Sequence, residues 1–286
     1  MTAHWPVMSQ EIIQLFLNQT ESPHFVDATF GRGGHTQALL QAFSTARVTA
    51  IDRDPDAIAY GQSLVSVYGD RLRMIQSRFS DLPRWFQNGS VSGVLFDFGV
   101  SSPQLDTAER GFSFMHDGPL DMRMEKTGES AADLVNGMGE RELADLIFEY
   151  GEERASRRIA KAIIQFRSKM LFSRTEQLST VIQSVIPRRG KLHPATKTFQ
   201  ALRIAVNQEI HEIEMVLPRA VSVLKPGGCM VVMAFHSLED RIVKNFFKTS
   251  DVFSEKTKKP IRAQRTEVCA NPRSRSACLR YGVCAS

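Results

Sequence analysis

Cysteine is scarce in this sequence, which has only four in 286 residues: Cys229, Cys269, Cys278 and Cys284. No two of them form a C-x-x-C pair, and the last three are separated by eight and then five residues. Structural zinc sites usually carry two tight pairs of ligands. We therefore expect no metal site, and we expect reduced thiols in a reducing compartment.

Long apolar runs are also missing. The longest uninterrupted one, Cys229–Phe235, is far too short to cross a bilayer. Residues 1–11 lack the basic stretch and following apolar run of a secretion signal. These absences predict a cytoplasmic protein that does not enter a membrane. The sequence also shows no internal repeat of the kind that marks solenoids.

Positive charge is unevenly distributed along the chain. The net charge is +5, but residues 241–286 hold eleven Lys or Arg against three Asp or Glu, a net of +8. Residues 1–240 therefore carry about −3. Concentrated basic charge favours a polyanionic partner such as nucleic acid, although a solvated tail that binds nothing has the same composition.

Strands and helices alternate in the first hundred residues. Short apolar segments predict strands at His24–Ala28, Val48–Ile51 and Val94–Phe96, and a helix follows the first through residues 38–43. After the second strand, Asp54 can cap a helix and Pro55 suits its first turn. A late strand, Cys229–Phe235, follows the turn 224–228. This order predicts an α/β protein with a parallel sheet and right-handed crossovers.

The strand pattern is interrupted between Pro103 and about Phe199. Helical i, i+3, i+4, i+7 spacing takes its place, in the two sets Leu143, Leu146, Ile147, Tyr150 and Leu178, Val181, Ile182, Val185. We therefore predict a discontinuous α/β domain, 1–103 and 200–286, that ends in a basic C-terminal tail, 241–286. Residues 104–199 are predicted to form an inserted helical domain that recognises the substrate.

A glycine-rich turn follows the first predicted strand. It runs from Asp27 through Gly31, Gly33 and Gly34, and a helix comes directly after it. Such turns let the backbone approach a nucleotide at a helix N-terminus. Asp52 stands 21 residues after Gly31 at the end of the second strand. A carboxylate there can accept hydrogen bonds from both ribose hydroxyls of an adenosine.

The alternative cofactor is a dinucleotide such as NAD. Its fingerprint requires G-x-G-x-x-G, whereas the third glycine position here is Thr36. Asp27, before the turn, suits a ligand with a cationic amino acid better than a pyrophosphate. Together with Asp97 at a third strand end, the pattern favours S-adenosylmethionine.

Several longer segments match one family in the same order. They are 4–8, 27–35, 50–55, 96–105, 110–114, 118–124 and 235–241, which include Gly-Arg-Gly-Gly-His, Ile-Asp-Arg-Asp-Pro, Gly-Pro-Leu-Asp-Met-Arg-Met and Phe-His-Ser-Leu-Glu-Asp-Arg. In these segments the chain resembles the bacterial small-subunit ribosomal RNA (cytosine-N4)-methyltransferases. The segment after Phe247 is shorter than in many members, which leaves the contribution of the tail to RNA binding open.

The resemblance implies a class I, Rossmann-like, S-adenosylmethionine-dependent methyltransferase sheet with an inserted helical domain. The implied substrate is a cytosine in the decoding region of small-subunit RNA, either free or in the assembled subunit. The implied cofactor contacts are Gly33, Gly34, His35, Asp52, Phe79, Asp97 and Gln104.

Methylation of an exocyclic amine needs alignment and hydrogen-bond acceptors for the amino protons, but no cysteine nucleophile. Asp97 and Ser102 follow a strand end and are candidates for this role, in an element that loosely resembles the Ser-Pro-Pro-aromatic motif of amino-group DNA methyltransferases. His236 follows the last buried strand. It is either a proton acceptor or a structural partner of backbone groups. Asp240 and Arg241 are expected to form a structural ion pair.

RNA contacts are expected from the insertion and the tail, because the target base must be presented unstacked. The candidates are basic residues in a loop between helices and near the C-terminus: Arg188, Arg189, Lys191, His193, Lys197, Arg273 and Arg275. Phe112 and Phe114 could stack on a base, but we favour packing for both.

Two other functions remain open. One is a methyltransferase with the same cofactor fold that acts on a small molecule or a protein, which the basic segments disfavour. The other is an RNA-binding assembly factor with an inactive cofactor fold, which the intact Asp27, Gly31, Gly33 and Asp52 disfavour.

Overall fold

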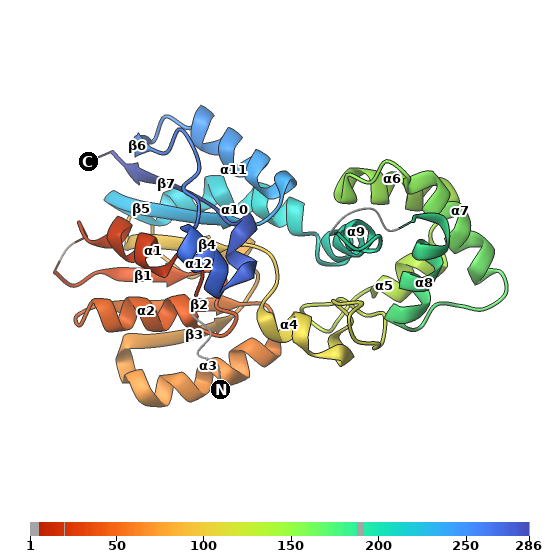
Figure 1. Ribbon diagram of the computed structural model, residues 1–286. Coiled ribbons are helices and arrows are strands. Elements are labelled where there is room, and N and C mark those ends of the chain that lie inside the picture. The colour runs from red at the N-terminus through yellow and green to blue at the C-terminus, as the bar shows by residue number, and fades with distance from the viewer. Residues whose placement is uncertain (1–5, 20, 188–191, 286) are drawn as a thin grey trace. The chain divides into compact units, whose positions relative to one another are not determined.

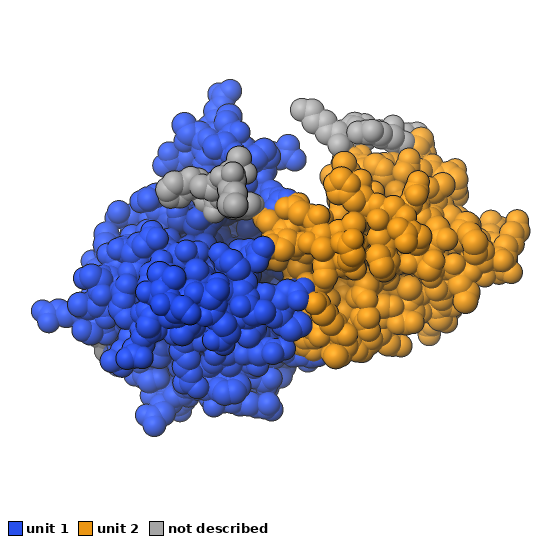
Figure 2. Space-filling view, turned by 90° about the horizontal axis from the view of Figure 1, so that it is seen from below, with its two compact units in different colours: residues 1–99, 210–286 blue, residues 100–209 orange. Residues whose placement is uncertain are grey.

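The computed structural model describes residues 6–19, 21–187 and 192–285. The chain divides into two compact units, which Figure 2 colours separately. Unit 1 comprises residues 1–99 and 210–286, and unit 2 comprises residues 100–209. The whole predicted insertion, 104–199, lies within unit 2.

Unit 1 is built on one seven-stranded sheet with the order β3-β2-β1-β4-β5-β7-β6 (Figure 1). The strands β1 to β5 run parallel to one another, and β7 is antiparallel to both β5 and β6. The strand bounds are β1 His24–Asp27, β2 Arg47–Asp52, β3 Leu72–Gln76, β4 Val91–Asp97, β5 Leu224–Ala234, β6 Phe253–Lys256 and β7 Cys278–Cys284. The predicted α/β class with a parallel sheet is confirmed.

Helices cover both faces of this sheet, because the alternating strand side chains give each face its own apolar cluster. The helices α1 (Ser9–Phe16), α2 (Gly34–Ala42) and α3 (Pro55–Tyr68) pack on one face. The other face is covered by α10 (Glu209–Val223), α11 (Ser237–Thr249) and the 3-10 helix η2 (Phe79–Arg84). As predicted, Asp54 caps α3 by accepting from Asp56 N at 3.0 Å, and Pro55 occupies its first turn.

The C-terminal segment 241–286 has a basic composition that led us to expect a polar tail, but most of it is folded. It contains the last part of α11, then β6, α12 (Arg265–Ala270), the 3-10 helix η4 (Pro272–Ser276) and β7. The strand β7 lies between β5 and β6 and is largely buried. Its sequence has Arg280 and Gly282 near the middle, and these residues interrupt the apolar pattern by which a buried strand is predicted.

Arg280 lies in β7 with only 4% of its side chain exposed. Its guanidinium donates to both carboxylate oxygens of Asp240 in α11, at 2.8 and 3.2 Å. The sequence had suggested Arg241, the next residue along, as the partner of Asp240. The ion pair instead joins residues 40 positions apart, and it ties the last strand to α11.

Unit 2 is helical. Its helices are α4 (Ser102–Asp106), α5 (Ala131–Gly137), α6 (Glu140–Gly151), α7 (Ser156–Arg167), α8 (Thr175–Val185) and α9 (Thr196–Asn207), with the 3-10 helix η3 at Ala108–Arg110. The two predicted apolar stripes lie on α6 and α8, where Leu143, Ile147, Leu178 and Ile182 are fully buried in the core of the unit. Within the described residues, no helix is long and apolar enough to cross a membrane.

Removal of the Asp240 carboxylate should destabilise unit 1, because the Arg280 guanidinium would stay buried without its counter-charge. We expect Asp240→Ala to lower the free energy of unfolding by about 2 to 3 kcal/mol, somewhat less than for a fully buried pair, because 24% of Asp240 is exposed. Chemical denaturation measures the change. The control Asp251→Ala, at an exposed residue, should have almost no effect; equal losses in both variants would contradict a stabilising pair.

Candidate active site

Three aspartates end neighbouring parallel strands in unit 1. Asp52 is the last residue of β2, Asp27 of β1 and Asp97 of β4, and these strands are adjacent in the order β2-β1-β4. Because the carboxyl ends of parallel strands meet at one edge of the sheet, the three carboxylates converge there. The sheet therefore concentrates negative charge at one edge, where a cationic ligand would be favoured.

The turn between β1 and α2 depends on glycine. Gly31 and Gly33 have φ of 55° and 68°, in the left-handed region. A Cβ atom on Gly33 would lie 2.5 Å from Cε2 of Phe30, so a larger residue would not fit without movement. Gly34 begins α2 and packs closely on Pro6. The predicted cofactor residues Gly31, Gly33 and Gly34 thus form a tight corner that directs the α2 N-terminus to the sheet edge.

Asp52 joins the two loops that follow β1 and β2. One carboxylate oxygen accepts from Gly31 N at 2.7 Å, and the other accepts from Asp54 N at 2.8 Å. Removal from water raises the pKa of Asp52 to about 6, although these two N–H groups act in the opposite direction. Nearby Asp54 and Asp27 add to the increase. The two backbone N–H groups therefore hold the carboxyl in place.

Asp27 is fully buried beneath this edge. Its carboxylate accepts from Thr36 Oγ1 at 2.6 Å and from Thr29 N at 3.2 Å. Burial raises the pKa of Asp27, while the two hydrogen bonds and the charge of His35 lower it in part.

His35 lies in the first turn of α2, buried beside two of the aspartates. Its Nε2 lies 3.4 Å from Oδ2 of Asp97. Burial lowers the pKa of His35, but the Asp97 carboxylate, together with Asp27 and Glu267, outweighs it, and the net pKa is raised. The charged imidazolium is thus favoured between the carboxylates. The second oxygen of Asp97, Oδ1, is buried and accepts no hydrogen bond within the described residues.

Phe79 opens η2 just after β3. Its ring is 5.6 Å from that of Phe98 and 6.1 Å from that of Phe96, and the side chain is only partly buried. This predicted cofactor residue therefore presents part of an aromatic surface next to the strand ends.

His236, at the end of β5, caps α11. Its Nδ1 accepts from Glu239 N at 3.4 Å, while Oε2 of Glu239 accepts from Phe235 N and His236 N. Its Nε2 lies 3.0 Å from Oε1 of Glu239. This reciprocal arrangement is a capping box in which histidine takes the place of serine or threonine. The structure shows the predicted contact of His236 with a backbone group, and its role as a proton acceptor stays a prediction.

Ser102 and Gln104 belong to unit 2, at the start of α4. Ser101 precedes the helix as its N-cap, and Oε1 of Gln104 accepts from Ser101 N at 2.9 Å. Gln104 is buried. The two predicted site residues therefore sit in a capped helix start that follows Asp97 closely along the chain.

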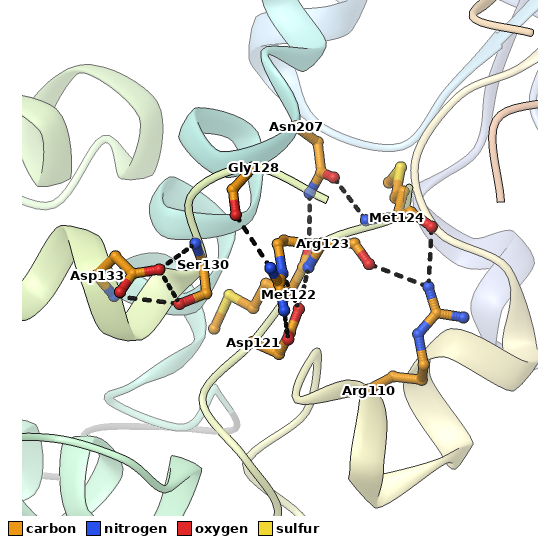
Figure 3. A network of polar contacts seen from close by, with 9 residues as sticks. All are labelled: Arg110, Asp121, Met122, Arg123, Met124, Gly128, Ser130, Asp133 and Asn207. Carbon is orange, nitrogen blue, oxygen red and sulfur yellow. Dashed lines mark hydrogen bonds and ion pairs between the residues drawn. The ribbon is translucent and has the colours of Figure 1, made fainter. Parts of the chain in front are cut away.

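A polar network in unit 2 holds the segment 121–124 (Figure 3). In the sequence, this segment was noted only as part of the family motif 118–124. Asn207, in α9, donates to Met122 O at 2.7 Å and accepts from Met124 N at 2.9 Å. Arg110 donates to the carbonyl groups of Arg123 and Met124. Met122 has a φ of 64°, a strained value for methionine. Four hydrogen bonds between these two side chains and the backbone of residues 122–124 therefore fix a strained loop.

A side-chain ion pair completes this network. Arg123 donates to both oxygens of Asp121, at 3.0 and 2.6 Å, and to Gly128 O at 3.0 Å (Figure 3). Partial burial opposes ionisation of Asp121, but the hydrogen bonds from Arg123 outweigh it and lower the pKa. Sequence reasoning assigned no role to Asn207.

The predicted RNA contacts belong to both units. His193 and Lys197 belong to unit 2, and Arg273 and Arg275 are exposed on η4 of unit 1. Arg188, Arg189 and Lys191 lie outside the described residues. Lys197 Nζ donates to Glu152 O at 2.8 Å, just after the C-terminus of α6, where a cation is favoured.

Phe112 and Phe114 pack within unit 2, as favoured from the sequence. Phe112 is buried, and the ring of Phe114 stacks on His193 with centroids 4.4 Å apart. The histidine predicted to contact RNA is thus also part of an aromatic contact.

Sequence reasoning missed several residues that support this site. Thr29 and Thr36 bind the aspartates: Thr29 Oγ1 accepts from Asp97 N at 2.7 Å, and Thr36 donates to Asp27. Apart from their position in or next to the glycine-rich turn, nothing in the sequence distinguishes these two threonines. Glu239 did have one, because it follows His236 by three residues, the spacing of a capping box.

The model of the MraW methylase family matches residues 1–283. The chain belongs to this family. A protein called "Ribosomal RNA small subunit methyltransferase H" from Methylocella silvestris is 48% identical, with 98% of this chain and 87% of that protein covered. Another of that name, from Rippkaea orientalis, is 49% identical, with 97% and 91% covered. The family predicted from the sequence motifs is confirmed.

Solved structures also resemble this chain. An rRNA methylase from Streptococcus thermophilus is similar over 100% of both chains, with 11% identity and a TM-score of 0.45. A SAM-dependent methyltransferase from Aquifex aeolicus covers 98% of this chain and 90% of its own, with 8% identity and a TM-score of 0.45. From its family, the protein is an S-adenosylmethionine-dependent methyltransferase, as the sequence predicted.

The raised pKa of Asp52 should make stability depend on pH in a defined direction. Because the folded state holds this proton more tightly than the unfolded state, the free energy of unfolding falls as pH rises from about 4 to about 6. Asp52→Asn cannot titrate, so it should lack a decrease of up to about 3 kcal/mol over this interval. Chemical denaturation at several pH values tests the difference. The exposed control Asp251→Asn should keep the wild-type slope; parallel curves for wild type and Asp52→Asn would refute the assignment.

Proposed function

We propose that this methyltransferase transfers a methyl group from S-adenosylmethionine to the exocyclic N4 of a cytidine in the decoding region of small-subunit ribosomal RNA. The single observation that carries the proposal is the full-length similarity, at 48 to 49% identity, to proteins named as small-subunit ribosomal RNA methyltransferases. The cytidine N4 comes from the resemblance of the sequence motifs. The substrate is the RNA, either free or within the small subunit.

The residues at the sheet edge fit the cofactor chemically. Asp52 would accept from the ribose hydroxyls, and Phe79 offers an aromatic surface for the adenine. The cofactor carries a sulfonium and an ammonium group, which match the negative charge of Asp27 and Asp97. The buried Oδ1 of Asp97 lacks a donor within the described chain, and a cationic N–H group would supply one. Gly31, Gly33, Gly34, His35 and Gln104 complete the proposed cofactor contacts.

The cofactor supplies an electrophilic methyl group, and the chain supplies alignment and acceptors. An exocyclic amine becomes a better nucleophile when acceptors hold its protons. We assign this role to Asp97 and Ser102, the first an ionisable acceptor and the second a hydroxyl at a helix start. His236 caps α11, and its Nδ1 is engaged there. We therefore assign it a positioning role at the end of β5.

The cysteines support direct attack by the amine. Carbon methylation of a pyrimidine first needs a thiolate to add to the ring. Cys229 is buried in the middle of β5, and burial raises the pKa of its thiol to about 12. Burial also raises the pKa values of Cys278 and Cys284. Cys269 is exposed on α12. The three buried thiols are therefore unsuited to be activated nucleophiles.

The decisive experiment supplies labelled S-adenosylmethionine with small ribosomal subunits, with free small-subunit RNA, and with a protein extract. Nucleoside analysis of the RNA should show N4-methylcytidine. Label in protein or small molecules alone would favour a different substrate class. Calorimetry without any cofactor binding would favour an inactive assembly factor.

Asp52→Ala should weaken S-adenosylmethionine binding while unit 1 stays folded. The variant removes a charged acceptor of two ribose hydrogen bonds, each worth about 1.5 to 3 kcal/mol, so we expect an increase in Kd of at least about tenfold. Isothermal calorimetry measures the Kd, and circular dichroism checks the fold. Asp251→Ala serves as the exposed control. An unchanged Kd for Asp52→Ala would exclude the ribose contact.

A variant without cysteine should remain active. When all four cysteines are changed to Ala or Ser, methyl transfer should continue, and mass spectrometry of digested RNA should place the methyl group on the exocyclic nitrogen. Since three of the residues are buried, circular dichroism must confirm the fold. Loss of transfer in a folded variant, or a methyl group on ring carbon, would refute direct attack.

A further inference from the structure

The helix α7 carries an exposed basic face that none of the proposed RNA contacts includes. Residues 154–174 contain seven Lys or Arg and no Asp or Glu. Two of the seven are engaged locally: Arg167 donates to Val135 O, and Arg174 pairs with Asp117. The other five are exposed, and we call them the α7 basic face: Arg154, Arg157, Arg158, Lys161 and Lys169.

Helical geometry places the α7 basic face opposite the core. Ile159, Ala160 and Ile163 form the inward side of the helix and are fully buried. At 100° per residue, Arg157, Arg158 and Lys161 point away from them. Arg154 and Lys169 lie just beyond the two ends of the helix. The basic groups therefore extend along the whole length of α7, which is about 18 Å for twelve residues.

Little within unit 2 neutralises this charge. Asp145 lies 3.3 Å from Arg157, but both side chains are more than half exposed, which makes this a weak surface pair. Arg158 donates to Val185 O at 2.5 Å, which orients its guanidinium and leaves its charge. For Arg154, Lys161 and Lys169, no carboxylate within the described residues lies at ion-pair distance.

The arrangement is unfavourable for the helix alone. Arg157 and Arg158 are in the first turn of α7, at the positive end of the helix dipole, where acidic residues are preferred. The i, i+4 pair Arg157 and Lys161, and the i, i+3 pair Arg158 and Lys161, place like charges next to each other. A local rule broken repeatedly on one exposed face is typical of a functional surface.

One residue already predicted to bind RNA, Lys197, makes a contact close to the start of the α7 basic face. Lys197 donates to Glu152 O, two residues before Arg154. Val185, the partner of Arg158, precedes Arg188 by three residues in the chain. Both contacts lie within unit 2: one joins α7 to the last residue of α8, and the other joins α9 to the C-terminus of α6.

We propose that the α7 basic face binds the phosphate backbone of the RNA substrate. The inference rests on the proposed function and adds the place where unit 2 holds the RNA. Arginine and lysine on a rigid helix suit phosphate groups, and they provide affinity and register without reading bases. A membrane surface is a poorer match, because an interfacial helix inserts its apolar face, and that of α7 is buried in the core.

The test neutralises three residues that have no hydrogen-bond or ion-pair partner within the described chain. Arg154→Gln/Lys161→Gln/Lys169→Gln should bind a labelled decoding-region hairpin RNA more weakly. Its log–log salt slope should be smaller by about one for each phosphate that the variant no longer binds, hence by up to about three. Fluorescence anisotropy over a KCl series measures both. The Kd for S-adenosylmethionine should not change, and the KM for RNA should rise more than kcat falls.

Two matched variants control for charge and fold. Arg47→Gln/Arg73→Gln/Lys248→Gln removes three exposed charges from unit 1 and should keep the wild-type slope. Arg154→Lys/Lys161→Arg/Lys169→Arg retains the charge of the α7 basic face and should bind like wild type. An equal reduction of slope in the unit 1 control would contradict a specific role for α7. So would a wild-type slope in the neutralised variant.

The remaining outcomes separate this inference from the proposed function. If wild type methylates the RNA and the neutralised variant binds normally, only the α7 inference fails. If wild type binds RNA through α7 but transfers no methyl group to it, the proposed function is wrong and the α7 basic face is still an RNA-binding surface. Binding to phosphatidylglycerol vesicles or to an acidic protein, without RNA binding, would overturn both.

Discussion

The structure of unit 1 depends on three aspartates brought to one edge of a parallel sheet. Asp27, Asp52 and Asp97 end adjacent strands, and removal from water disfavours the charges of Asp27 and Asp52. The surrounding groups offset this cost. Backbone N–H groups of Gly31 and Asp54 hold Asp52, Thr36 holds Asp27, and His35 lies between Asp27 and Asp97. The chain's own groups thereby orient these side chains, and such orientation lowers the entropic cost of binding a ligand.

His35 shows how the charges at this edge are balanced. Burial alone would favour the neutral imidazole, yet three carboxylates raise its pKa overall. The positive charge reduces the repulsion between Asp27 and Asp97, and Oδ1 of Asp97 still lacks a donor within the described chain. An incompletely satisfied buried acceptor beside a glycine turn is the arrangement expected of a binding site for a cationic ligand.

Unit 2 combines a rigid loop with a charged surface. Asn207, Arg110 and the pair Asp121 and Arg123 fix the strained segment around Met122, so that this segment keeps one conformation. The α7 basic face supplies positive charge from a helix whose other side is anchored in the core. Basic surface therefore occurs in the middle of the chain, although composition alone drew attention to the C-terminus.

Local features of the sequence determined much of this protein. The glycine turn, the aspartate after each strand, the apolar stripes of α6 and α8 and the cap of α3 depend on residues a few positions apart. Other features were decided only by the tertiary structure, because they depend on contacts between residues that are far apart in the sequence. Asn207 reaches Met122 across 85 positions, and Asp240 reaches Arg280 across 40. The strand β7, with a charged residue at its centre, is stable between β5 and β6 because Asp240 compensates that charge. Sequence periodicity and residue propensity cannot identify these distant partners, because the contacts form only when the chain has folded.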